Sequence, residues 1–436
     1  MGAGRAGAPV RVGLLGCGVV GGATARLLTE HAADLTARSG VRIELARVAI
    51  RSRSKPREVA LTPEVWTTDP WEVAADPTID VVVETIGGIE PALDLVLHAI
   101  RSGKHVVTAN KELLSTLGHE VMEAGAEAGV DVLFEASVAG GIPIVRPLKE
   151  SLAGDRIKRI MGIVNGTTNF ILTRMSDTGA SFAQALGEAE GLGYTELDPT
   201  TDIEGFDAAA KIAILASLAF NARVVAGDVF REGISGITPA DVAAAHDLGY
   251  EIKLVAVADV EDGRISARVH PAMLPRTHPL ASVRDVYNAV FVEGQEVGEL
   301  MFLGRGAGGA PTASAVVGDV VEIARNIATG NKNPGGAYYR ERRPAMPLDD
   351  VRARYYVVLS VEDLPGVLSE VAGVFGRHGI SIASVRQEGF GDGATLIVIT
   401  HVGTEAQHSA TFAELGRLEV VKSVGSRMRV EGTSEA

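Results

Sequence analysis

The sequence contains a single cysteine, Cys17, among its 436 residues. No disulfide can form within the chain and no cysteine-based metal site can be built, which predicts a reducing, cytoplasmic setting. The opening residues, MGAGRAGAP, lack the apolar core of a secretory signal. No stretch approaches the roughly 18 apolar residues of a membrane-spanning helix, so we expect no membrane partner.

A surplus of basic residues is also missing. Lys and Arg total 41 against 55 Asp and Glu, which gives a formal net charge of -14. Nucleic-acid partners require clustered Lys and Arg, so we expect no nucleic acid and favour a small-molecule substrate. The length predicts about three domains, each able to bury a core.

A glycine-rich turn follows the first apolar run, Val10 to Leu15, and precedes a helical pattern from Ala23 to Leu28. A strand, a GxGxxG turn and a helix, in that order, are typical of dinucleotide binding, because the glycines let a pyrophosphate approach the helix N-terminus. The cofactor residues predicted here are Gly16, Gly18, Val19, Val20 and Gly21. The alternative is a tight turn without a ligand. The alternation of β and α patterns predicts an α/β, Rossmann-type first domain.

The second predicted strand, Ile43 to Ile50, is followed by Arg51, Arg53 and Lys55 instead of an acidic residue. An acid at this place accepts the ribose hydroxyls of NAD, whereas basic side chains can hold a 2′-phosphate. NADP(H) is therefore favoured and NAD(H) stays possible. The alternative is a solvated basic loop.

Two further strands, Val81 to Glu84 and His105 to Thr108, flank a predicted helix from Pro91 to Ser102. Open α/β sheets bind ligands at the carboxyl ends of their strands, so Thr85 and Thr108 are predicted to lie beside the cofactor. Lys111 follows closely, either as a cofactor and active-site group or as a solvated lysine.

A crowd of acids precedes a purely apolar helical pattern in the stretch from Ala189 to Phe220. Asp207 stands four residues before Lys211, which places both side chains on one helical face. We expect Glu204 to join that face. An ordinary surface ion pair is the alternative, but the apolar residues after Lys211 indicate a buried helix.

Four blocks resemble those of the homoserine dehydrogenase family. They are VVTANK from Val106, EASVAGGIPI from Glu135, NGTTNFIL from Asn165, and the acid-rich stretch that runs from Asp198 to Lys211. The resemblance covers roughly residues 10 to 330. It implies NAD(P)H-dependent interconversion of L-aspartate 4-semialdehyde and L-homoserine, in threonine, methionine and isoleucine biosynthesis.

The resemblance also implies roles for individual residues. Lys111 and Lys211 are the implied catalytic groups, and either could transfer the proton. Glu196, Asp202 and Asp207 are the implied substrate ligands, and Gly306 is implied to approach the cofactor. Thioester chemistry needs a cysteine beside the nicotinamide, and Cys17 lies in the phosphate-binding turn instead. A non-catalytic sensor of nucleotide and amino acid is the alternative from another class.

A cation site is implied by the block after Glu135. In the family this block resembles a monovalent cation site, which maps carboxylate or backbone oxygens of Glu135, Val138, Gly140 and Ile142 as ligands, with sodium as the ion. The alternative is a tight turn between two domains.

The sequence pattern predicts a separate module in the C-terminal part of the chain. A linker rich in Pro, Gly and charge precedes a βαββαβ pattern that opens with Asp363-Leu364-Pro365-Gly366. This pattern resembles an ACT domain, which implies L-threonine as the effector of a homo-oligomer, dimer or tetramer. A dimerisation module without a ligand is the alternative. The predicted division is a flexible N-terminus (1–9), a Rossmann domain (10–140, with a return segment 306–330), an α+β substrate and dimerisation domain (141–305), a linker (331–352) and a ferredoxin-like ACT domain (353–431).

Overall fold

The computed structural model describes residues 8–57, 59–195, 198–331, 343–389 and 393–432. The chain divides into two compact units, each built from segments distant in sequence. Unit 1 comprises residues 1–166, 207–229 and 286–343, and unit 2 comprises residues 167–206, 230–285 and 344–436. The domain boundaries expected from the sequence stay predictions.

Unit 1 contains a parallel sheet of six strands in the order β3-β2-β1-β4-β5-β6. Its central strands are buried along nearly their whole length, as expected for a parallel sheet covered by helices. The Rossmann-type fold predicted for this region is confirmed. The strands are β1 (Val10–Leu15), β2 (Ile43–Ala49), β3 (Trp66–Thr67), β4 (Val81–Glu84), β5 (His105–Thr108) and β6 (Val132–Leu133).

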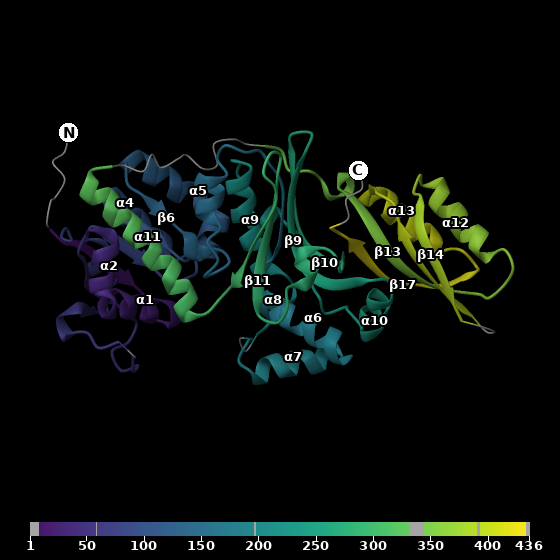
Figure 1. Ribbon diagram of the computed structural model, residues 1–436, viewed down its shortest axis with the longest axis horizontal. Helices are drawn as coiled ribbons and strands as arrows, with labels where there is room; N and C mark the ends of the chain where they lie inside the picture. The colour runs from purple at the N-terminus through teal and green to yellow at the C-terminus, as the bar shows by residue number, and fades with distance from the viewer. Residues whose placement is uncertain (1–7, 58, 196–197, 332–342, 390–392, 433–436) are drawn as a thin grey trace. The chain divides into compact units, whose positions relative to one another are not determined.

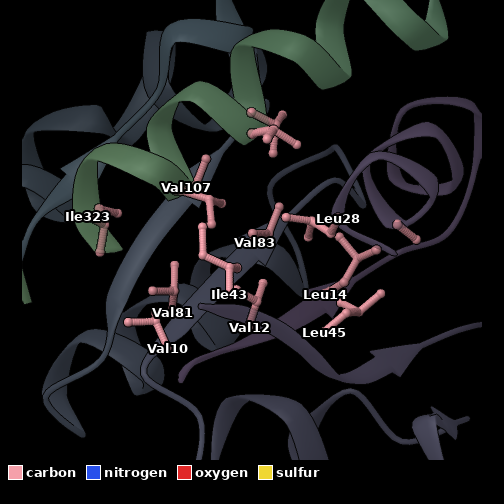
Figure 2. Packing of buried hydrophobic residues seen from close by; sticks show 14 of the residues in the cluster. Val10, Val12, Leu14, Leu28, Ile43, Leu45, Val81, Val83, Val107 and Ile323 are labelled. Carbon is pink, nitrogen blue, oxygen red and sulfur yellow. The ribbon is translucent and has the colours of Figure 1, made fainter. Parts of the chain in front are cut away.

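Helices cover this sheet, and one of them returns from late in the chain. The helix α11 (Gly309–Thr329) packs against α1 and α2, so a segment near residue 320 completes the core of the first sheet (Figure 1). Figure 2 shows Ile323 of α11 in the same cluster as Val81 and Val107. The other helices are α1 (Val19–Glu30), α2 (Ala32–Ser39), α3 (Trp71–Ala74), α4 (Ala92–Arg101) and α5 (Lys111–Ala128).

Unit 1 also holds three antiparallel strands and the apolar helix predicted after Asp207. The strand β11 (Tyr287–Gly294) lies between β7 (Ile157–Ile163) and β12 (Gly298–Arg305). The helix α9 (Phe206–Ala219) is buried on most of its circumference, as the sequence predicted.

Unit 2 is built around a long hairpin of β9 (Tyr250–Glu261) and β10 (Arg264–Pro275). Both residues of its turn, Asp262 and Gly263, have positive φ, which a two-residue turn that follows the strand twist requires. The predicted hairpin is confirmed. Around it lie β8 (Phe230–Arg231) and the helices α6 (Gly166–Thr178), α7 (Phe182–Gly191), α8 (Thr200–Ile203) and α10 (Pro239–Asp247).

The C-terminal module belongs to unit 2 and has the predicted βαββαβ order, with its strands arranged β17-β13-β15-β14. Two helices cover one face and share an apolar core with the strands. The elements are β13 (Arg352–Val361), α12 (Val367–Arg377), β14 (Ile382–Glu388), β15 (Ala394–Thr400), β16 (Gly403–Thr404), α13 (Glu405–Leu415) and β17 (Val421–Val430).

The last strand of this module is hydrogen-bonded to the hairpin of unit 2. Arg429 of β17 pairs with Ala272 of β10 in a parallel register. Its buried guanidinium donates to both carboxylate oxygens of Glu405, with Nε 2.7 Å from Oε1, and also to Glu232, at 2.8 Å. Tyr355 donates its hydroxyl to Glu405 at 2.8 Å. The module is therefore joined to the hairpin by backbone pairing, whereas the buried charge-assisted hydrogen bonds between Arg429, Glu405 and Tyr355 lie within the module itself.

No helix in the described part of the chain is both long enough and apolar enough to span a bilayer.

Candidate active site

The glycine-rich turn joins β1 to α1 with the geometry that a pyrophosphate requires. Gly16 has a φ of +93°, and α1 begins immediately after Gly18, so the first N–H groups of the helix are at the turn. A Cβ on Gly21 would lie 2.2 Å from the carbonyl oxygen of Gly16, whereas one on Gly18 would meet nothing within 4 Å. Gly21 thus permits close packing, and Gly18 leaves space beside the helix N-terminus. These residues fit a dinucleotide.

The side chains around this turn differ in exposure. Val19 is 78% exposed, and Val20 packs partly against the core. The hydroxyl of Thr85 donates to the carbonyl oxygens of Leu15 and Gly16, at 3.1 Å each, and so stabilises the backbone of the turn. Thr108 donates to the buried carboxylate of Glu84 at 2.6 Å. Both hydroxyls therefore bond within the protein, at the carboxyl ends of β4 and β5.

The basic loop after β2 is exposed at Arg51, Arg53 and Lys55. A fourth basic residue, missed in the sequence, orders this loop. Arg57 donates to the carbonyl oxygens of Ser52, at 2.7 Å, and of Lys55, at 2.8 Å, and its guanidinium interacts with the Cys17 thiol. Burial raises the pKa of that thiol, and Arg57 opposes the rise. The loop is thereby tied to the glycine-rich turn.

Two lysines meet one carboxylate where α5 and α9 come together in unit 1. Lys211 lies one turn after Asp207 on α9, and its Nζ is 2.6 Å from Oδ2 of Asp207. Lys111, the first residue of α5, donates to Oδ1 of the same carboxylate. Asp207 is buried, and the Lys111 side chain is 46% exposed. The structure brings together three of the residues predicted for the site.

Electrostatics hold Asp207 in its charged form. Burial alone would raise the pKa of Asp207, but Lys211 and Lys111 together lower it far below its ordinary value. The site therefore presents an ionised carboxylate with an ammonium group on each oxygen. A pair of cations held in this way can stabilise an oxygen that gains negative charge during a reaction.

Asn165 and Val164 also contact this cluster, and neither was predicted as a site residue. Asn165 donates its side-chain amide to Oδ2 of Asp207 at 2.9 Å, and the carbonyl oxygen of Val164 accepts from Lys211 at 2.6 Å. The NGTTN block that begins at Asn165 was the available signal, but it could equally cap the helix that follows.

The other predicted acids belong to unit 2 or lie outside the described residues. Asp202 is half-buried in α8, in unit 2. Glu196 lies outside the described residues. The prediction that Glu204 shares the helical face is wrong, because α9 begins only at Phe206 and the Glu204 carboxylate accepts from Ser235 at 3.1 Å.

The predicted cation ligands lie in a tight, buried turn. Both oxygens of the Glu135 carboxylate accept backbone N–H groups, from Ile144 at 2.6 Å and from Val145 and Arg146. The Glu135 carboxylate is therefore engaged by the backbone, and the cation ligands at Glu135, Val138, Gly140 and Ile142 stay a prediction. Across the described residues, no three His, Cys, Asp or Glu side chains gather as metal ligands.

Gly306 packs against this turn. A Cβ on Gly140 would lie 2.4 Å from the carbonyl oxygen of Gly306, and a Cβ on Gly306 would overlap Asn288. The return segment comes close to the dinucleotide turn three residues later, where a Cβ on Gly309 would lie 3.1 Å from Val19.

A Rossmann-type sheet, a glycine-rich turn that fits a dinucleotide, and two lysines that share one buried carboxylate define a dehydrogenase that uses a pyridine nucleotide. Comparison with known proteins identifies which one. Residues 16–135 match the model described as homoserine dehydrogenase, NAD binding domain, residues 143–321 match the homoserine dehydrogenase model, and residues 355–420 match the ACT domain model.

Relatives match over the full length of the chain. Homoserine dehydrogenases of Mycobacterium tuberculosis and Corynebacterium glutamicum are each 49% identical over 98% of this chain, and the matches cover 98% and 96% of those proteins. The crystal structure of a homoserine dehydrogenase from Thiobacillus denitrificans superposes with a TM-score of 0.92 at 42% identity, and the match covers 98% of this chain and 99% of that chain. The chain belongs to the homoserine dehydrogenase family and is an NAD(P)-dependent oxidoreductase.

Proposed function

We propose that this chain catalyses the NADPH-dependent reduction of L-aspartate 4-semialdehyde to L-homoserine, and the reverse oxidation, with Lys111, Asp207 and Lys211 as the reacting cluster. The observation that carries this proposal is the sharing of one buried carboxylate by two lysines. The bound nicotinamide supplies or accepts the hydride.

The protein's own residues handle charge and protons in this scheme. Hydride delivery to an aldehyde leaves negative charge on its oxygen, and an ammonium group beside that oxygen stabilises the charge and can donate the proton. Asp207 keeps both lysines in place. Lys111 is the more exposed of the two, and Lys211 is held from two sides. Either lysine can therefore meet the oxygen and transfer the proton.

Substrate and cofactor roles are proposed for residues that the sequence pattern singled out. Glu196 and Asp202 would hold the ammonium and neighbouring groups of the amino acid, and Asp207 would bind substrate and orient Lys211. Arg51, Arg53 and Lys55 would bind a 2′-phosphate, which favours NADP(H) over NAD(H). The use of NADP(H) is supported by the structure of a hyperthermophilic archaeal homoserine dehydrogenase mutant in complex with NADPH. That protein is 29% identical to this chain, with a TM-score of 0.61, and the match covers 72% of this chain and 98% of that chain. The backbone oxygens after Glu135 would bind sodium.

The experiment that tests the proposal is homoserine oxidation with NADP and with NAD, followed by the absorbance of the reduced cofactor. Wild type should turn over, and Lys111→Ala and Lys211→Ala should each lose about 10²-fold or more in kcat. Lys104→Ala is the matched control, because Lys104 is also buried in unit 1 but bonds only to backbone carbonyls of Asp76 and Ile79 among the described residues.

The Lys104 variant should lose stability while keeping its kcat per folded enzyme. A folded wild type that binds NADPH, yet does not lower its absorbance when the semialdehyde is added, would favour the alternative of a non-catalytic sensor.

Regulation is the second part of the proposal. L-Threonine would inhibit the enzyme by binding at the ACT module of a homo-oligomer, and the turn from Asp363 to Gly366 is the place where α12 begins. Removing the whole module is a poor test, because it would strip β10 of its neighbour β17 and leave Arg268 without its partner Glu431. The sharper test compares inhibition by L-threonine and D-threonine in wild type and Asp363→Ala. Inhibition by both isomers, or equal inhibition of both proteins, would contradict this site.

A further inference from the structure

Oδ2 of Asp207 accepts two hydrogen bonds, from the ammonium of Lys211 at 2.6 Å and from the side-chain amide of Asn165 at 2.9 Å. Oδ1 accepts from Lys111. A carboxylate oxygen accepts about two hydrogen bonds, so Oδ2 is fully engaged and the carboxylate plane is fixed at three points.

Val164, the residue before Asn165, contacts Lys211, the other member of the Asp207–Lys211 pair. The carbonyl oxygen of Val164 accepts from Lys211 at 2.6 Å. Two consecutive residues therefore contact both partners of the i,i+4 pair on α9, one with a donor for the carboxylate and one with an acceptor for the ammonium. Within the described residues, these bonds occupy two of the three N–H donors of Lys211.

The segment that carries these two groups is buried and closely packed. It follows β7, whose last residue, Ile163, is in register with Ala289 of β11. Val164 and Asn165 are 1% and 5% exposed. A Cβ on the next residue, Gly166, would lie 2.9 Å from the carbonyl oxygen of Val286, so the backbone there is closely packed.

We propose that Asn165 is a positioning residue, which orients the Asp207 carboxylate so that Lys111 and Lys211 are held at a fixed separation beside the reacting oxygen. An amide suits this role because it donates a hydrogen bond but carries no charge and exchanges no proton at neutral pH. The inference rests on the proposed function, since it assigns a role within the same cluster.

Two substitutions test the inference. Asn165→Ala removes the donor, so kcat for homoserine oxidation should fall about tenfold or more at every pH, with a smaller change in the affinity for NADP. Asn165→Asp has nearly the same shape but donates only when its carboxyl group is protonated. The ratio of its kcat to that of wild type should therefore fall by about tenfold as pH rises and the added carboxyl group ionises.

Asn326 provides the matched control. Its side-chain amide donates to the Asp131 carboxylate at 3.0 Å, on α11 and away from the lysines. Asn326→Ala and Asn326→Asp should keep the kcat of wild type, with a ratio to wild type that does not change with pH. All rates are taken per folded enzyme, from circular dichroism at each pH and from titration with NADP.

The outcomes separate the two proposals. A pH-independent ratio for Asn165→Asp, or a kcat within about twofold of wild type for Asn165→Ala, overturns the positioning role; the expected loss is at least tenfold. If Asn165→Asp fails to fold, Asn165→Ala decides alone. Absence of homoserine oxidation in wild type would remove the proposed function itself, whereas turnover in wild type with unaffected Asn165 variants would remove only this inference.

Discussion

Replacement of Arg429 by Met should destabilise unit 2 far more than an ordinary surface substitution. The Arg429 side chain is 5% exposed and that of its partner Glu405 is 6% exposed. With Arg429 gone, Glu405 would keep only the hydroxyl of Tyr355 as a side-chain hydrogen-bond partner within the described residues, in a buried site. Breaking a buried pair in this way costs about 3–5 kcal/mol, because an uncompensated charge stays buried.

The structure shows which of the two lost contacts accounts for this cost. Glu232 also bonds to Arg429, but its side chain is 45% exposed and water can replace the guanidinium. Glu232→Gln should therefore cost less than about 1 kcal/mol. Arg429→Met combined with Glu405→Gln should recover most of the lost stability, because no buried charge is left.

Urea unfolding followed by far-ultraviolet circular dichroism measures these differences. The only two tryptophans, Trp66 and Trp71, lie in unit 1, so their fluorescence monitors the other unit in the same titration. Arg427→Met is the control, since Arg427 precedes Arg429 by two residues on β17 and is exposed. If Arg429→Met unfolds within about 1 kcal/mol of Arg427→Met, the buried pair does not stabilise the module as argued.

Three further changes test other parts of the structure. Burial lowers the pKa of Lys253 to about 8, whereas an exposed lysine titrates near about 10.4. The unfolded chain binds more protons between these values, so the stability of wild type relative to Lys253→Met should rise with pH in this window, by up to about 3 kcal/mol in urea titrations; no rise would contradict the burial of a charged group. Arg51→Ala, Arg53→Ala and Lys55→Ala together should raise KM for NADP about tenfold while KM for NAD changes less, and equal changes would argue against 2′-phosphate recognition. Thr238→Ala removes the side-chain acceptor of the Asp241 N–H in a capping box at α10 and should cost about 1 kcal/mol in thermal unfolding, whereas an unchanged unfolding temperature would show that the cap is dispensable.

Local sequence patterns were enough to predict most of the secondary structure. The strands β1, β4 and β5 have the expected bounds, and the turn at Asp262 and Gly263 lies where the sequence placed it. These elements are set by apolar runs and by glycine or Asp-Gly turns, whose effects act within a few residues. The pairing of Asp207 with Lys211 is local in the same way, because helical geometry alone brings i and i+4 together.

Local sequence patterns did not predict the contacts between segments that are distant in sequence. Lys111 meets Asp207 across 96 residues, and Arg57 reaches the thiol of Cys17. The Glu135 carboxylate caps backbone N–H groups instead of standing free, and Glu204 precedes its expected helix. Spacing along the chain does not encode such neighbours, since they depend on how strands and helices pack.

The sequence by itself determined the class of fold, the dinucleotide turn, the βαββαβ module and one lysine-carboxylate pair, because each follows from chain geometry over a few residues. Only the tertiary structure decided that Lys111 and Asn165 join that pair, and that Arg429 ties β17 to its neighbours. The physical reason is that hydrogen bonds and ion pairs act over about 3 Å in space, whereas a sequence specifies directly only what is near along the chain.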